Sequence, residues 1–238
     1  MKTIIHKANT RGFANHGWLK SHHTFSFAGY QNPERMNFGM LRVLNDDVVQ
    51  PEMGFGTHPH QNMEIISIPL KGALSHKDSM GNKRAIEVDE VQVMSAGTGL
   101  THSEFNDSKT DDVNFLQLWI IPEEMSVKPN YEQRMFDVSE RKNQLQTVVA
   151  PKDKIEGEAL PISQQAYIYR TTLDADNAVD LNLKSENNGV YVFVVDGEVE
   201  VADNTLEQRD ALGVSEIESV TINAKKTSDL VIIEVPMN

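Results

Sequence analysis

The stretch GFGTHPHQNME at residues 54–64 places two histidines, His58 and His60, on either side of a proline. Residues i and i+2 of a β-strand point to the same face, about 6.5 Å apart by backbone rise. The proline also holds His58 in an extended conformation, which favours a strand. The stretch therefore predicts a strand that presents two imidazoles side by side.

A second polar pair with the same spacing, His102 and Glu104, lies in GTGLTHSEFN at residues 97–106. If the two strands are neighbours, three imidazoles and one carboxylate converge on one point. Such a mixed nitrogen and oxygen set suits a divalent first-row metal, namely Fe, Ni, Cu, Mn or Zn. We therefore expect a metal site, against the alternative of scattered surface histidines. The predicted ligands are His58, His60, His102 and Glu104.

Short apolar runs rich in β-branched and aromatic residues alternate with turn signals along the chain. These runs are MEIISIPL (63–70), FLQLWII (115–121), QAYIYR (165–170), AVDLNL (178–183), VYVFVV (190–195), EVEV (198–201) and DLVIIEV (229–235). Helical patterns are short and few. Many short strands with close turns predict an all-β sandwich or barrel.

A faint internal repeat suggests two such units. IISIPLKGALSH (65–76) parallels VYVFVVDGEVEV (190–201), each with a strand, a glycine and a second strand. The segment 122–160 between them is rich in Pro, Lys, Glu and Gln and is typical of a linker. We therefore expect two similar barrels in tandem.

Aligning the repeat shows which residues of the second unit stand opposite the predicted ligands. Leu183 and Ser185 fall opposite the first histidine pair, and Asn223 and Lys225 fall opposite His102 and Glu104. None of the four is a carboxylate or an imidazole, so we expect the second barrel to hold no metal.

The amino-acid composition excludes several classes of protein and of metal site. The 238 residues include no cysteine, so disulfides and thiolate metal sites are excluded. The net charge is −13, most of it after residue 150, which disfavours nucleic-acid binding and favours solubility. The N-terminus lacks a signal-peptide core, and no run of about 18 apolar residues could span a membrane. A cytoplasmic monomer is the expectation.

The stretches GFGTHPHQNMEI and QVMSAGTGLTHSE resemble the pirin family of the cupin superfamily, and most closely its bacterial branch described as quercetin 2,3-dioxygenases. RGFANHGWLKSHHTFSFAGY at residues 11–30, FGMLRVLNDD and YEQRMFD (131–137) resemble that branch too. The likeness is strong over residues 1–137 and looser to the end.

The resemblance implies a bicupin of two jelly-roll-like β-barrels with few short helices. Residues 1–135 would form the N-terminal barrel with the metal site, and residues 136–238 a metal-free C-terminal barrel. The metal would be iron(II) in the first instance, with Ni, Cu, Mn and Zn as alternatives. Glu64 would stand near the metal without binding it directly.

The resemblance also implies that a small aromatic substrate, a flavonol such as quercetin, is cleaved with O2. Glu104 would then be both a ligand and the catalytic base that accepts the substrate's hydroxyl proton. The alternative is a metal-bearing regulatory protein that acts by binding a partner protein. A metal-free structural barrel is a third possibility.

Further residues are candidates for the surroundings of the site. Phe55, Met94, Phe115 and Trp119 are expected to line a pocket. His16, His22 and His23 lie in an aromatic arm, which either covers the site or, as we favour, packs on the barrel. His76, on the strand after the first glycine of the repeat, could face inward near the metal.

Overall fold

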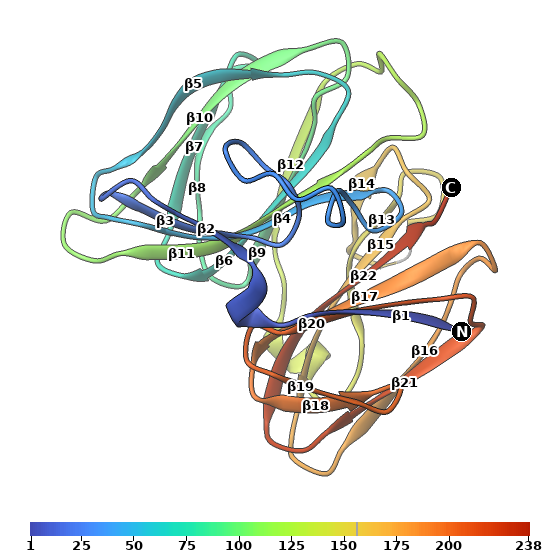
Figure 1. Cartoon of the computed structure of the whole chain (residues 1–238). Coiled ribbons are helices and arrows are strands. Elements are labelled where there is room, and N and C mark those ends of the chain that lie inside the picture. The colour runs from blue at the N-terminus through green and yellow to red at the C-terminus, as the bar shows by residue number, and fades with distance from the viewer. Residues whose placement is uncertain (156) are drawn as a thin grey trace.

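The computed structural model describes residues 1–155 and 157–238, and it consists almost entirely of β-strands (Figure 1). The strands form two seven-stranded and two four-stranded sheets. The only helices among the described residues are two short 3-10 turns, and neither is long or apolar enough to cross a membrane. The predicted all-β bicupin fold is confirmed, with open sheets that face each other in each half.

The strands of the first half form one sandwich. Its bounds are β2 (Gly12–Asn15), β3 (Leu19–His23), β4 (Leu41–Val49), β5 (Gly54–His60), β6 (Glu64–Lys71), β7 (Leu74–Asp78), β8 (Lys83–Ile86), β9 (Glu90–Ser95), β10 (Leu100–Asn106), β11 (Val113–Ile120) and β12 (Asn130–Met135), and η1 (Ala8–Thr10) precedes β2. The large sheet has the order β12-β9-β6-β11-β4-β3-β2, and the small sheet has the order β5-β10-β7-β8.

The second half repeats this plan. It comprises η2 (Val138–Arg141), β13 (Gln146–Pro151), β14 (Leu160–Ile162), β15 (Tyr167–Leu173), β16 (Ala178–Asn182), β17 (Asn188–Asp196), β18 (Glu198–Val201), β19 (Asn204–Glu207), β20 (Ala211–Ser215), β21 (Ser219–Ala224) and β22 (Ser228–Pro236). With β1 (Lys2–His6) at its edge, the large sheet has the order β1-β20-β17-β22-β15-β13-β14, and the small one has the order β16-β21-β18-β19.

The two large sheets pack against each other through one shared apolar core. On β11, Leu116, Leu118 and Ile120 enter this core, together with residues of β17 and β22 from the other half. Because side chains alternate along a strand, the intervening positions of β11 face the small sheet of their own sandwich. Gln117 and Trp119 are two of these positions, and both line a pocket there.

The repeat read from the sequence corresponds to equivalent corners of the two sandwiches. Gly72 and Gly197 follow the strands β6 and β17, where the chain passes from a large sheet to a small one. Their φ values of 76° and 96° lie in the left-handed region, which side chains other than glycine's rarely adopt. At Gly197, an added Cβ would also lie 2.3 Å from Ser228 Oγ.

The interior of the second sandwich is apolar where the first carries its histidines. Val179, Leu181, Val220 and Ile222 point inward from β16 and β21 and belong to one buried cluster. The residue pairing predicted from the repeat is wrong by one position on β21, because the alternation of burial puts Ile222 and Ala224 inside and Asn223 on the outer face. A repeat aligned on its turns cannot detect such a shift.

The prediction of a linker over residues 122–160 is wrong. That segment contains β12, η2 and β13, and the residue outside the described part of the chain, 156, falls within it. β12 is an edge strand with mostly half-buried or exposed side chains, so its polar composition resembles that of a loop.

The first strand crosses to the other half of the molecule. β1 (Lys2–His6) pairs with β20, so residues 2–6 extend the second large sheet rather than the first. The division into residues 1–135 and 136–238 stays a prediction, and β1 does not follow it. Burial lowers the pKa of His6 to about 4, with the charge of Arg35 as a smaller cause, and a ring nitrogen of His6 shares a hydrogen bond of 2.6 Å with the Tyr191 hydroxyl.

His6 should make the stability depend on pH. Its pKa is lower in the folded chain than the ordinary value of 6.5, so below pH 6.5 the unfolded chain binds a proton that the folded chain excludes. We expect the free energy of unfolding to fall by up to ~3 kcal/mol from this residue as the pH drops from 6.5 to 4. Urea denaturation of His6→Gln should show a correspondingly flatter pH dependence, and identical slopes in both proteins would contradict the expectation.

Candidate metal centre

The strands β5 and β10 are direct neighbours, as the sequence required for a shared site. His102 pairs with His58, and Leu100 pairs with His60. The ring centroids lie 4.4 Å apart for His58 and His102, 4.8 Å for His60 and His102, and 4.9 Å for His58 and His60. The three imidazoles therefore form one compact cluster inside the first sandwich.

The nitrogens of this cluster are free to bind an ion. His58 Nδ1 lies 2.8 Å from the Gly56 carbonyl oxygen, which can only accept, so Nδ1 carries the hydrogen and Nε2 keeps a lone pair. His102 is 1% exposed, and neither of its ring nitrogens has a hydrogen-bond partner among the described residues. Buried polar atoms normally have partners, so unpartnered nitrogens facing two other imidazoles fit a metal.

The pKa values of two cluster histidines favour the neutral, metal-binding form. Burial, followed by the neighbouring imidazoles of His102 and His58, lowers the pKa of His60 to about 4. Burial is also the main reason why the pKa of His102 falls to about 3, with smaller contributions from His58 and His76. Both rings are neutral at pH 7, as a metal ligand must be.

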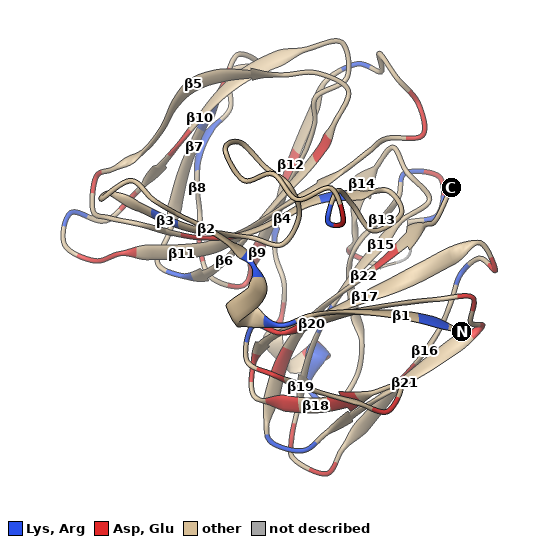
Figure 2. Ribbon diagram, viewed as in Figure 1, with Lys and Arg blue, Asp and Glu red and all other residues tan. Residues whose placement is uncertain are grey.

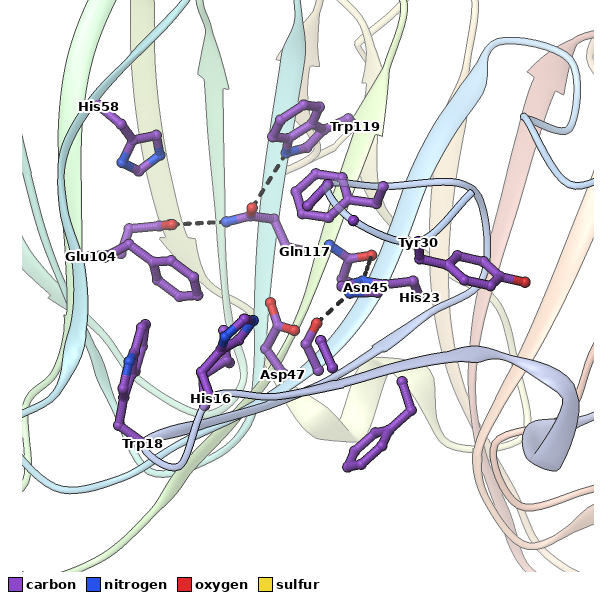
Figure 3. Close-up of a pocket in the computed structure, with 18 of the residues that line it drawn as sticks. His16, Trp18, His23, Tyr30, Asn45, Asp47, His58, Glu104, Gln117 and Trp119 are labelled. Carbon is purple, nitrogen blue, oxygen red and sulfur yellow. Dashed lines mark hydrogen bonds between the residues drawn. The ribbon is translucent and has the colours of Figure 1, made fainter. Parts of the chain in front are cut away.

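Glu104 follows His102 on the same strand, beyond a β-bulge that shifts the register between them. The ligand atoms of Glu104 and His102 lie within 4.8 Å of each other, but among the described residues Glu104 is grouped with His102 and His76 rather than with His58 and His60. Its carboxylate accepts hydrogen bonds from Ser67 Oγ at 3.2 Å and from Gln117 Nε2 at 2.8 Å. Trp119 Nε1 in turn donates to Gln117 Oε1 at 3.3 Å (Figure 3). These contacts fix the orientation of a carboxylate that is 1% exposed.

His76 forms a second potential ligand group with His102 and Glu104, whose ligand atoms lie within 4.8 Å of one another. Its side chain faces inward and is buried, and Nε2 lies 3.2 Å from Asp78 Oδ2. The ring stacks on Tyr131 with centroids 4.7 Å apart. His76 is thus a buried neighbour of the cluster, with its ring centroid 5.3 Å from that of His102, and it does not line the pocket.

A pocket of about 640 Å³ opens onto the cluster (Figure 3). Its walls are largely aromatic, with Trp18 against Phe55 and Phe27 against Trp119, at centroid distances of 5.4 and 5.3 Å. Phe55 and Trp119 were expected here. The same expectation for Met94 and Phe115 is wrong, because both lie fully buried in small apolar clusters beside the pocket.

The N-terminal arm, residues 11–30, forms one wall of this pocket. His16 and His23 line it, and so does Trp18. His22 points elsewhere and packs on Phe13, with centroids 4.8 Å apart. The arm is therefore packed on the sandwich, as favoured from sequence, and it also encloses the site, as the alternative expected.

Glu64 lies on the opposite face of its strand from the site, contrary to the expectation. Its carboxylate accepts a hydrogen bond of 2.6 Å from Ser95 Oγ. Burial raises its pKa, and a backbone hydrogen bond from Ser163 in the second half opposes this shift. Because side chains alternate along β6, Ser67 faces Glu104 while Glu64 faces the second half.

The family model described as Pirin matches residues 5–120, and the model described as Quercetinase C-terminal cupin domain matches residues 147–235. The chain belongs to the pirin family. Within it, the protein named quercetin 2,3-dioxygenase of Escherichia coli K12 is 43% identical over 98% of both chains. The pirin-like protein of Caulobacter vibrioides is 37% identical, covering 94% of this chain and 95% of its own.

A solved pirin structure has the same fold throughout. The bacterial pirin YhhW from Escherichia coli, crystallised in complex with nickel(II), superimposes with a TM-score of 0.92 and 40% identity, and the match covers 99% of each chain. The pirin fold described above is therefore shared along the whole length, including the half without inward-facing histidines.

Removing one imidazole should abolish metal binding. His102→Ala deletes the ring that touches both other histidines, and we expect the affinity for Fe(II) or Ni(II) to fall at least ~100-fold, since even indirect partners of metal ligands contribute 10–100-fold. Calorimetric titration of the apoprotein measures this. His16→Ala, in the same pocket but outside the cluster, should bind metal as the wild type does. Unchanged affinity in His102→Ala would exclude the site.

Proposed function

We propose that His58, His60, His102 and Glu104 bind one divalent transition metal, iron(II) in the first instance, and that the chain cleaves flavonols such as quercetin with O2. The observation that carries the proposal is the buried imidazole of His102, whose two ring nitrogens have no partner among the described residues. It lies against His58 and His60, and these two line an aromatic pocket. The nickel complex of the bacterial pirin YhhW and the name of the Escherichia coli relative support it.

The donor set and the pocket suit this chemistry. When bound, the metal supplies Lewis acidity that lowers the pKa of a coordinated hydroxyl. Glu104, oriented by Ser67 and Gln117, accepts the proton of the substrate's hydroxyl. The aromatic walls hold a flat ring system and exclude water from it.

Only the first of the two sandwiches binds the metal in this proposal. The metal belongs to residues 1–135, and residues 136–238 hold none, because the inward positions of β16 and β21 are apolar. The monomeric state and the cytoplasmic location remain predictions from the sequence.

Glu104→Gln should remove the proposed base while keeping one oxygen that can bind the metal. Glutamine keeps the shape and can still accept the hydrogen bond from Gln117, but it cannot take up a proton at neutral pH. We expect the turnover of quercetin, measured as oxygen consumption with iron(II) present, to fall by a factor on the order of 10² or more. Metal content must be measured alongside, and Glu158→Gln, an exposed carboxyl in the second half, serves as the matched control.

The same assay tests the competing functions. Stoichiometric metal without oxygen consumption by the wild type would overturn the dioxygenase and favour a regulatory protein that acts on a partner. Substoichiometric metal after purification without chelators would overturn the metal centre itself.

A further inference from the structure

The wall of the pocket contributed by β4 carries a carboxyl group that the proposed reaction does not use. Asp47 lines the pocket and is 3% exposed. Its Oδ1 has no hydrogen-bond partner among the residues that the structure describes. Burying an unpartnered carboxyl oxygen is costly, so its place in a ligand pocket indicates that a bound molecule supplies the missing donor.

Hydrogen bonds among neighbouring polar side chains hold one oxygen of the Asp47 carboxyl in place. His23 Nδ1 lies 3.0 Å from Asn45 Oδ1 and 3.3 Å from Ser21 Oγ. Because the amide oxygen only accepts, His23 Nδ1 carries the hydrogen, and Ser21 keeps its own hydrogen for Asp47. The hydrogen bond from Ser21 involves the Asp47 carboxyl and lowers its pKa. Asp47 thus has one oxygen held by the arm and one left for a ligand.

The raised pKa of Asp47 is consistent with a carboxyl group that lacks a hydrogen-bond donor at one oxygen. Burial raises the pKa of Asp47 to about 7, against the lowering effect of Ser21, and the charges of Asp46 and Glu104 raise it further. A donor from a ligand would favour the ionised form, as a hydrogen bond to a carboxylate does.

Asp47 lines the same pocket as two of the cluster histidines, His58 and His60. In Figure 3 its carboxyl lies between His16 and Gln117 and points into the pocket, below Glu104 and apart from His58. Both groups line the same cavity of about 640 Å³. A flat molecule that reaches the cluster with one edge therefore has other edges within the reach of this wall.

We propose that Asp47 is a substrate-binding residue that accepts a hydrogen bond from a second hydroxyl group of the substrate. It thereby selects polyhydroxylated aromatic molecules over those that carry only the metal-chelating hydroxyl and carbonyl pair. This inference rests on the proposed function, whose metal ligands lie elsewhere in the pocket.

The test compares two ligands that differ only in their further hydroxyls. Quercetin has several, and 3-hydroxyflavone keeps the chelating pair alone. Binding to the metal-loaded protein is measured under nitrogen by quenching of the fluorescence of Trp18 and Trp119, the two tryptophans of the chain. Asp47→Leu should weaken quercetin binding at least ~10-fold, as expected for a lost hydrogen bond to a charged group, and leave 3-hydroxyflavone binding unchanged or tighter.

Two further variants keep the test decisive. Asp47→Asn retains an acceptor without the charge, so its preference for quercetin should fall between those of the wild type and Asp47→Leu, and it provides the answer if the leucine variant does not fold. Asp112→Asn changes an exposed carboxyl next to β11 and should alter neither affinity. With oxygen present, KM for quercetin should rise in Asp47→Leu while kcat is largely kept.

The outcomes that overturn the proposal are distinct. Equal losses for both ligands would show that Asp47 only supports the fold of the pocket, and no loss for either would show that it touches no substrate. A wild type that binds neither flavonol, with its metal in place, would instead overturn the proposed function together with this inference.

Discussion

The packing of the two seven-stranded sheets against each other is the interaction on which the rest of the molecule depends. Each large sheet gives one face to the shared core and the other to its own small sheet. The alternation on β11 that buries Leu118 in the shared core therefore also aims Gln117 at Glu104. A slip of one residue in this strand would turn every pocket residue into the core and every core residue into the pocket.

The same architecture is filled in two different ways. The second sandwich is packed with apolar side chains from both of its sheets, which form one continuous cluster. The first has two small apolar clusters, and the imidazoles, Glu104 and the pocket occupy the space between them. Unpaired polar groups and a cavity both cost stability, and the shared core and the apolar second half offset that cost.

The sequence predicted the parts of the site that depend on short spacing. His58 and His60, and likewise His102 and Glu104, lie two apart on strands, and the period of a strand alone places each pair on one face. Asp47 and Gln117 were missed because they reach the pocket only through the pairing of β4 with β11. One signal was present, since Asn45 and Asp47 stand two apart in the strand LRVLNDDVV and therefore share one of its faces.

Other misses have equally physical causes. The strand β12 reads as a linker because an edge strand has few buried side chains, and composition alone does not separate the two. Glu64 was placed near the metal by resemblance, whereas strand alternation from Ser67 would have assigned it to the opposite face.

Because β1 pairs with the second large sheet, neither half of the molecule keeps all its contacts when it is produced alone. A fragment cut after residue 135 would leave the apolar face of its large sheet bare to water, and its first strand would have lost β20 as a partner. The arm that encloses the pocket begins only a few residues after β1, so its anchorage lies on the other lobe (Figures 1 and 2). A tag or deletion at the extreme amino terminus would thus disturb ligand access at a distance.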